Sequence, residues 1–171
     1  MQTWDAMRAR RNVRAYADRP IPADLLDRIL EAGRRAPSAG NSQPWDFVVV
    51  TDRDQLIELS KVWTYGSHVA RSAATIALVT GVVTEGRQRE LIQYDLGQAT
   101  MSMMVAAADL GIGTGHSSVA DQDLARSVLG LPPDRYCAYL VTAGYPADRP
   151  LRPIARPSRR PFDDVVHRGR W

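Results

Sequence analysis

Arginine is the residue type in this chain that most clearly indicates a binding function, and arginines cluster near both ends of the sequence. One group comprises Arg8, Arg10, Arg11 and Arg14, and the other comprises Arg149, Arg152, Arg156, Arg159 and Arg160. Planar guanidinium groups bind phosphate through paired hydrogen bonds, but runs of arginine also occur in arms that bind nucleic acid. The arginines alone therefore leave open whether the partner is a polymer or a small anion.

The other reactive side chains are too scattered to form a familiar catalytic centre. His68, His116 and His167 lie far apart in the sequence and indicate neither a metal site nor a catalytic triad. The glycine-rich run GIGTG (residues 111–115) follows a helical pattern, whereas a dinucleotide-binding fingerprint follows a strand and has a different spacing. Cys137 has no second cysteine to pair with and is expected to be a buried thiol. Any catalysis is therefore expected to depend on a bound cofactor, and no metal is predicted.

Composition is typical of one globular domain spanning residues 1–171, because 44% of the residues are hydrophobic and no linker divides the chain. The longest apolar run, residues 73–83, is far shorter than the roughly 20 residues that a membrane span needs. The N-terminal segment lacks the apolar centre of a secretory signal. We therefore expect a cytoplasmic protein with no membrane partner.

Alternating helices and strands are predicted along the chain. Thr3 is expected to cap a short helix that runs to about Arg11, and Pro22 is expected to open a second helix that ends near Ala36. Strands are predicted at residues 46–50, 74–83 and 136–145. Short helices are expected after Asp52 and between Asp121 and Gly130, since aspartate caps helix starts and glycine ends them. Strands separated by helices indicate a layered α/β or α+β domain.

A long helix is the clearest predicted element. Its apolar stripe consists of Ile92, Leu96, Ala99, Met103, Ala106 and Leu110, and Gly111 stands where a C-terminal cap belongs. The final segment, residues 146–171, differs in holding five of the eleven prolines. Such a proline-rich tail is expected to be extended, and either disordered or laid on a surface.

Several segments, taken in order, closely match one family. They are RARRNVRAY near the start, ILEAGRRAPSAGNSQPWDFVVV across the second helix and first strand, YDLGQATMSMMVAAADLGIG in the long helix, and then LGLPPD, AGYPAD and RRPFDDVVH. In these segments the chain resembles the FMN-dependent nitroreductase family over nearly its whole length. The resemblance implies an α+β three-layer fold with a central mixed sheet flanked by helices. It also implies a homodimer with FMN sites between the subunits and a C-terminal tail that extends onto the partner subunit.

The resemblance further implies a phosphate site built from both ends of the chain. Its phosphate and ribityl contacts match Arg10, Arg11, Asn12, Arg159 and Arg160. Arg14 matches a cation near the pyrimidine edge of the flavin. Because flavin reduction leaves negative charge near N1 and the C2 carbonyl, a fixed cation there would stabilise the reduced cofactor. Both basic regions would then serve one small anion.

Two further segments are implied to surround the flavin ring. The segment from the partner subunit matches Pro37, Ser38, Ala39 and Asn41. A loop whose backbone approaches the flavin N5 matches His116, Ser117, Ser118 and Val119. No side chain is expected to act as a catalytic acid or base, because the flavin N5 carries the hydride chemistry.

The predicted function is therefore electron transfer from NAD(P)H through FMN to a nitroaromatic, quinone or similar small acceptor, by a ping-pong mechanism. The covering segment of larger family members has little room between Val83 and Leu91, so we expect an open site. Two alternatives remain: a specialised flavin enzyme of the same fold, such as a dehydrogenase or a flavin-fragmenting enzyme, and a basic nucleic-acid-binding module. The nitroreductase resemblance disfavours a nucleic-acid partner.

Overall fold

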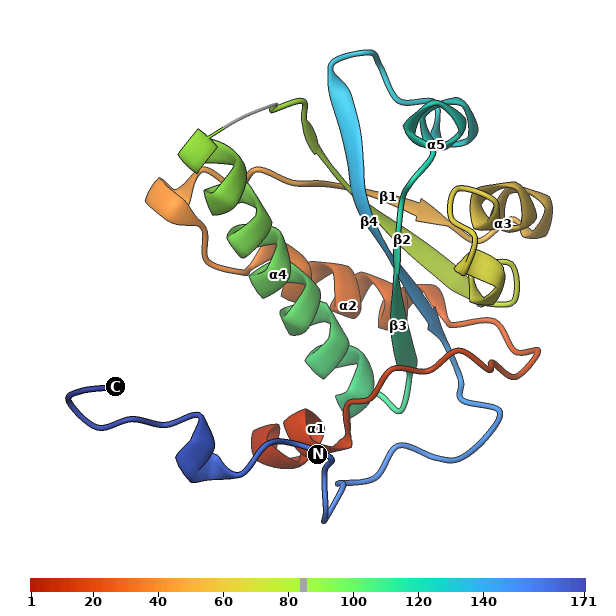
Figure 1. Ribbon diagram of the computed structural model, residues 1–171. Helices are drawn as coiled ribbons and strands as arrows, with labels where there is room; N and C mark the ends of the chain where they lie inside the picture. Colours follow the sequence, from red (N-terminus) through yellow and green to blue (C-terminus); the bar gives the residue numbers. More distant parts are fainter. Residues whose placement is uncertain (84–85) are drawn as a thin grey trace.

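A four-stranded sheet lies at the centre of the computed structural model, which describes residues 1–83 and 86–171 (Figure 1). The strands are β1 (Asp46–Val50), β2 (Ala74–Gly81), β3 (Gly113–Ser118) and β4 (Arg135–Gly144). Their order is β1-β2-β4-β3, and all three neighbouring pairs are antiparallel. The expected mixed sheet is therefore wrong for the described residues, where parallel pairing is limited to an isolated bridge between Asn12 and Thr114.

Helices cover both faces of this sheet and give the expected three-layer α+β arrangement. α2 (Ala23–Arg34) and α4 (Gly86–Asp109) pack together on one face, and α1 (Thr3–Ala9) lies against α4. α3 (Arg53–Ser60) and α5 (Gln122–Leu129) lie on the other face, at the right of Figure 1. None of the helices in the described residues has the length and apolar character needed to cross a bilayer.

Alternate residues of the strands fill two separate cores, as the two-residue period of a strand requires. Ile76 and Leu78 of β2 face α2 and α4, whereas Ala77 and Val79 face α3 and α5. Cys137 of β4 lies in the second core, where burial raises the pKa of its thiol to about 12. The expectation of a buried thiol is confirmed.

Close approach of α2 and α4 depends on Gly33. A Cβ at this position would lie 2.8 Å from Cγ of Met103, so a side chain there would separate the two helices. The stripe predicted for the long helix is accordingly at the interface: Leu96, Ala99 and Met103 are buried in the first core.

Local capping residues set the ends of the two short helices as predicted. The Asp52 carboxylate accepts the backbone N–H of Gln55 (2.9 Å) at the start of α3. Asp121 accepts the N–H of Leu124 (2.9 Å) at the start of α5, and Gly130 ends that helix in the left-handed conformation with φ 65°. These signals depend on adjacent residues, so the sequence alone is sufficient to place them.

Two predicted boundaries near the start of the chain are wrong. Gln2, and not Thr3, is the N-cap of α1, and the helix ends at Ala9, before Arg11. The helix stops early because residues 12 and 13 pair with β3, where the Val13 N–H donates to the Thr114 carbonyl (2.8 Å). The chain must leave helical geometry at Arg10 to reach this strand edge.

Residues 113–118 form the edge strand β3, although the sequence indicated a glycine-rich turn and a loop. Its residues have little intrinsic strand preference, and pairing with β4 from Gly113–Gly144 to Ser118–Tyr139 provides the extended structure. His116, Ser117 and Ser118 are therefore strand residues, and Val119 follows the strand.

The C-terminal tail runs across α1 of its own chain. The Ile154 N–H donates to the Arg8 carbonyl (3.1 Å), and beyond this point the described tail contains one short 3-10 turn, η3 (Phe162–Asp164). Figure 1 shows the tail ending away from the sheet. Extension of this tail onto a partner subunit stays a prediction.

Candidate cofactor site

The basic segment after α1 lies across glycines of the sheet. A Cβ at Gly115 would be 2.5 Å from the Val13 carbonyl oxygen, and a Cβ at Gly113 would be 2.6 Å from Cγ2 of Val13. The glycines of GIGTG thus provide room for this segment to approach the sheet, which gives them a purpose other than binding a dinucleotide. Arg10 and Asn12 are thereby fixed next to β3.

Tyr16 anchors the other end of the same segment. Its ring covers Gly144, where a Cβ would lie 2.7 Å from Cδ1 of Tyr16. The Tyr16 hydroxyl donates to the Val13 carbonyl (2.7 Å) and lies 2.6 Å from the Thr142 hydroxyl. Burial raises the pKa of Tyr16 to about 12, so the phenol stays neutral and keeps its donor proton. The basic segment is consequently held at both ends.

A cavity of about 440 Å³ opens beside this segment, between α4 and the exposed face of β3 and β4. It is lined by Arg10, by Gln93, Gly97, Thr100, Met101 and Met104 of α4, by His116 of β3 and by Tyr139 of β4. We call it the Arg10 cavity. Its volume is within the range of about 300–1,000 Å³ that is usual for ligand sites. Gly97 has open space beyond its Cα, which leaves a gap in the wall formed by α4.

The arginines predicted to bind phosphate are placed differently from one another. Nε of Arg10 is buried at the cavity and has no hydrogen-bond partner among the described residues. Arg11 instead donates to the Asp148 carboxylate (2.6 Å) and to the Arg149 carbonyl (2.8 Å), and this contact lowers the pKa of Asp148. Arg10 is thus available for an anion, whereas the Arg11 guanidinium ties the basic segment to the start of the tail.

Arg14 and the tail arginines do not line the Arg10 cavity within one chain. Arg14 is exposed and lies near enough to His68 for its charge to lower the pKa of that buried imidazole, after the larger effect of burial. Arg159 donates to the Ser158 carbonyl, and Arg160 donates to the Asp164 carbonyl, both in the exposed tail. The phosphate contacts of Arg159 and Arg160, and the position of Arg14 near the pyrimidine edge of the flavin, stay predictions.

The strand residues predicted to approach the flavin alternate between the two faces of β3. His116 lines the Arg10 cavity, and Ser118 is also exposed, whereas Ser117 is buried on the opposite face. Val119 follows the strand and packs at the second core. The structure therefore brings His116 and Arg10 to one cavity and directs the Ser117 side chain away from it, and their contact with a flavin stays a prediction.

The turn after α2 lies by an adjacent face of α4. Its Ala39 N–H donates to the buried Asp95 carboxylate of α4 (3.0 Å). Gly40, Asn41 and Gln43 in this tight turn have positive φ. Ser38 closes the turn by accepting the Gln43 N–H (2.9 Å).

Pro37 also lines a groove of about 850 Å³ on α1 and α4. This groove meets the Arg10 cavity along Gln93, Gly97 and Met101, which line both. None of residues 37–41 lines the Arg10 cavity itself. The turn and the cavity are therefore neighbours around α4 and do not form one closed site within the chain.

Sequence reasoning missed Gln93, Gly97, Thr100 and Tyr139 as cavity residues. The α4 residues among them recur at helical spacing on a face next to the buried stripe, so a second, more polar face was detectable. Tyr139 looked like an ordinary strand residue, but it is 39% exposed on the inner strand β4. In the described part of the chain, no three His, Cys, Asp or Glu side chains are grouped to hold a metal ion.

Comparison with known proteins agrees with the α+β fold. The model of the family described as "Nitroreductase family" matches residues 7–65 and 58–145. The chain belongs to the nitroreductase family of oxidoreductases.

Three relatives span nearly the whole chain. An Archaeoglobus fulgidus protein provisionally named NADH dehydrogenase/NAD(P)H nitroreductase is 32% identical, over 95% of this chain and 94% of the relative. The 5,6-dimethylbenzimidazole synthase of Rhodospirillum rubrum is 28% identical, over 91% and 89%. A provisionally named nitroreductase of Desulfovibrio desulfuricans, solved in complex with FMN, is 26% identical with a TM-score of 0.79, over 97% and 95%.

Proposed function

We propose that this protein is an FMN-dependent oxidoreductase that passes electrons from NAD(P)H to a small nitroaromatic, quinone or similar acceptor. The observation that supports it most directly is the buried Nε–H of Arg10, which lies at the Arg10 cavity of a nitroreductase-family chain and has no hydrogen-bond partner among residues 1–83 and 86–171. A buried donor without a partner costs about 1–3 kcal/mol, and a bound anion removes that cost. The name of the Archaeoglobus relative and the FMN complex of the Desulfovibrio relative support the same donor and cofactor.

The residues present fit FMN in charge and in space. Arg10 offers a charge-assisted hydrogen bond to the phosphate, and the gap at Gly97 admits a planar ring between α4 and the strands. The exposed face of β3 presents His116 at the floor of the cavity. When bound, FMN accepts two electrons from the nicotinamide and delivers them to the acceptor, so the protein need only bind and orient its ligands.

The site is proposed to be completed by a second copy of the chain. α4 exposes Tyr94, Gly97 and Met101, and α1 exposes Trp4 and Met7, so this face has large apolar side chains without cover. Such a patch is typical of an interface. A two-fold pairing through α4 would bring the turn at residues 37–41 of one chain toward the Arg10 cavity of the other.

For a nitro acceptor the proposed reaction balances with one donor. NAD(P)H, one proton and the nitro compound give NAD(P)⁺, the nitroso compound and water, and the two electrons come from the nicotinamide. Donor and acceptor would use the same open cavity in turn, which is the proposed ping-pong order. His116 lines this cavity but is given no acid role, because hydride transfer through a flavin does not require a protein acid.

Spectroscopy and turnover test this function together. The purified protein is expected to be yellow and to release FMN on denaturation in a ratio near one per chain. Anaerobic stopped-flow should show bleaching of the flavin band by NADH or NADPH, followed by reoxidation when a nitroaromatic or quinone is added. A colourless protein that added FMN cannot reconstitute would refute the proposal. Steep salt-dependent DNA binding by that protein would favour the nucleic-acid alternative.

A specialised flavin enzyme of the same fold is the second candidate. The observation that favours it is the full-length likeness to 5,6-dimethylbenzimidazole synthase. Aerobic incubation of the reduced protein, followed by chromatography of the flavin, distinguishes the two candidates. Recovery of intact FMN with fast acceptor turnover supports the reductase, and loss of FMN to a smaller product supports the specialised enzyme.

A further inference from the structure

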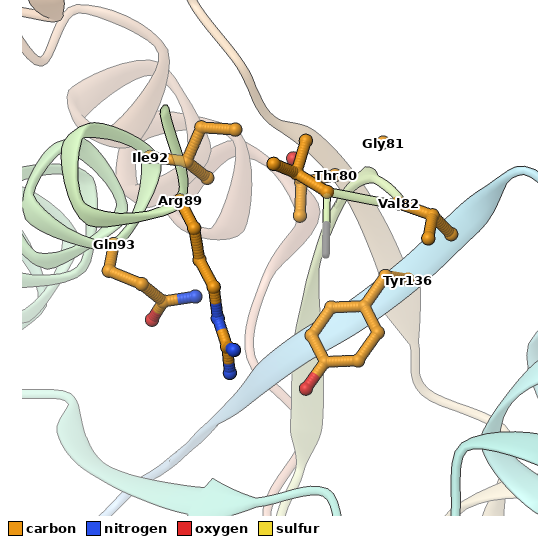
Figure 2. A pocket seen from close by; sticks show the side chains of 8 residues that line it. Thr80, Gly81, Val82, Arg89, Ile92, Gln93 and Tyr136 are labelled. Carbon is orange, nitrogen blue, oxygen red and sulfur yellow. The ribbon is translucent and has the colours of Figure 1, made fainter. Parts of the chain in front are cut away.

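A second hollow, of about 260 Å³, lies at the other end of the exposed strand face, where β2 ends and α4 begins. It is lined by Thr80, Gly81, Val82 and Val83 of the β2 end, by Arg89, Ile92 and Gln93 of α4, and by Tyr136 of β4. We call it the Arg89 pocket. Figure 2 shows the Arg89 and Gln93 side chains descending side by side from α4, with the Tyr136 ring facing them.

The lining of the Arg89 pocket has two chemical parts. The guanidinium of Arg89, the amide of Gln93 and the hydroxyl of Tyr136 are hydrogen-bonding groups, and Figure 2 shows all three reaching toward the same side of the hollow. Val82, Val83 and Ile92 provide apolar surface. No carboxylate lines the pocket within residues 1–83 and 86–171, and Arg89 forms no ion pair there. The pocket therefore suits a ligand with an apolar body and one negative charge.

The Arg89 pocket adjoins the proposed flavin site. Gln93 lines both the Arg89 pocket and the Arg10 cavity, and Tyr136 and Tyr139 of β4 line one hollow each. A ligand in the pocket would thus have one end at Arg89 and the other toward the Arg10 cavity. This position suits an acceptor whose reducible group must reach the flavin.

The size of the Arg89 pocket indicates that its anionic ligand is the acceptor and not the nicotinamide donor. The pocket is slightly smaller than the roughly 300–1,000 Å³ usual for drug-sized ligands, so it has room for a single ring and not for a dinucleotide. A guanidinium binds carboxylate in a planar, two-bond arrangement. The apolar surface beside it matches the face of an aromatic ring.

We propose that the Arg89 pocket selects acceptors that are aromatic carboxylic acids, with Arg89 as the specificity-determining residue and with Gln93 and Tyr136 as secondary hydrogen-bond donors. This inference rests on the proposed function for the identity of the reaction. It goes further by naming the acceptor class and the residues that choose it.

The test compares 4-nitrobenzoate with its neutral methyl ester as acceptors for the FMN-loaded protein. Wild type should favour the acid in kcat/KM, and Arg89→Gln should lower kcat/KM for the acid about tenfold through a higher KM, as expected for one charge-assisted contact at an open site. The ester should change less than twofold. Arg89→Glu should reverse the order and favour 4-nitrobenzylamine over 4-nitrobenzoate.

Arg87→Gln is the matched control. It removes the same charge two residues away, which is about 200° around the helix, and Arg87 does not line the pocket. The control should keep the wild-type ratio of acid to ester. Tyr136→Phe, which removes only the hydroxyl, should raise KM for the acid about threefold while its circular dichroism and flavin content stay unchanged.

A calorimetric titration of 4-nitrobenzoate into the oxidised protein separates this inference from the proposed function. Binding that weakens about tenfold in Arg89→Gln, and not in Arg87→Gln, supports the pocket even if the protein turns over no nitro acceptor. Normal turnover with the same acid-to-ester ratio in Arg89→Gln and wild type overturns the inference and leaves the function standing. A changed NADPH-to-NADH preference in Arg89→Gln, with an unchanged acid-to-ester ratio, also overturns it, because the anion would then be the donor's phosphate.

Discussion

Arg10 is the residue on which anion binding at the proposed site most depends. Nε is buried without a partner among the described residues in both Arg10 and Arg11, but Arg11 also donates through Nη2 to Asp148 and the Arg149 carbonyl, whereas Arg10 lines the cavity. Hydrogen bonds to a charged group contribute about 1.5–3 kcal/mol, which corresponds to roughly a tenfold to hundredfold change in affinity. Arg10→Gln should therefore raise the FMN dissociation constant by that factor, measured by quenching of flavin fluorescence.

Arg28→Gln provides the control for this loss of charge, since Arg28 is exposed on α2 and lines none of the three hollows described above. Its FMN affinity should equal that of wild type. Equal losses in Arg10→Gln and Arg28→Gln would mean that net charge, and not a local contact, determines FMN affinity.

His68 is expected to make stability depend on pH. Burial first, and then the charge of Arg14, lower its pKa in the folded protein below the ordinary value of 6.5. As pH falls below about 6.5, the unfolded chain therefore takes up a proton before the folded chain does, and the free energy of unfolding decreases. The contribution is fully present above that pH and is lost as pH falls toward the lowered pKa.

Urea unfolding at pH 7.5 and pH 5.5 measures this effect. His68→Gln should show a smaller decrease in midpoint between the two conditions than wild type. His167→Gln, in the exposed tail, should behave like wild type. An identical decrease in wild type and His68→Gln would assign the pH dependence to other groups.

At the scale of elements, the association of the basic segment with β3 and β4 is the feature that shapes the site. The side chains and backbone of residues 13–16 occupy the space above Gly113, Gly115 and Gly144. The Val13 N–H also donates a hydrogen bond to the Thr114 carbonyl. A displaced segment would move Arg10 away from the cavity. The glycines of β3 therefore connect strand geometry with anion binding.

Gly115→Ala tests this connection. The new Cβ would meet the Val13 carbonyl oxygen at 2.5 Å and the Thr142 hydroxyl at 3.1 Å, so the segment must shift. Overpacking of this kind costs about 1–3 kcal/mol, and we expect that loss in the free energy of unfolding together with a lower FMN content.

Gly81→Ala is the matched control, because the nearest atom to its new Cβ is Nη1 of Arg135 at an ordinary 3.8 Å. Its stability should change by less than about 0.5 kcal/mol, as at surface positions without special contacts. Comparable losses at both positions would show that flexibility of the glycine, and not space for Val13, is what the fold requires.

The same elements show what a sequence can predict. α3 and α5 have capping aspartates within three residues of the N–H that they accept, so their starts follow from local chemistry. β3 has no such local cause, because Gly113 and Gly115 become strand residues only through pairing with β4 and contact with Val13. The early end of α1 has the same origin.

The same distinction between local signals and tertiary contacts applies to the site. The family resemblance singled out Arg10 and His116, and both line one cavity, but their flavin contacts stay predictions. The hydrogen bond from Arg11 to Asp148 joins residues 137 positions apart, and neither segment indicates it in its own sequence. Gln93 and Thr100 belong to a helix that was interpreted by its buried stripe alone. Tertiary contacts decide which face of such a helix is left for a ligand.

At the scale of the whole molecule, α4 separates the turn at residues 37–41 from the cavity that the turn is proposed to complete. The turn is fixed to α4 through Asp95, and the cavity opens on the adjacent face. Two aromatic side chains on α4 and α1 are uncovered: Tyr94 is 70% exposed and Trp4 is 66% exposed. A second copy packed through α4 would bury these aromatic rings and bring a turn to each cavity.

Complementation between two inactive variants tests this shared site most directly. Arg10→Glu should inactivate a homodimer by repelling the FMN phosphate, and Ala39→Trp should inactivate another by filling the space of the flavin ring. In a heterodimer, one site receives both changes and the other receives neither. Refolding equal amounts together with FMN should therefore restore about one quarter of wild-type sites, from random two-fold pairing. Differently tagged chains verify that heterodimers form, and flavin content and acceptor reduction measure the recovery. Recovery near one quarter is the predicted result, whereas verified heterodimers without activity, beside a wild-type control that refolds normally, would contradict the account and place each site within a single chain.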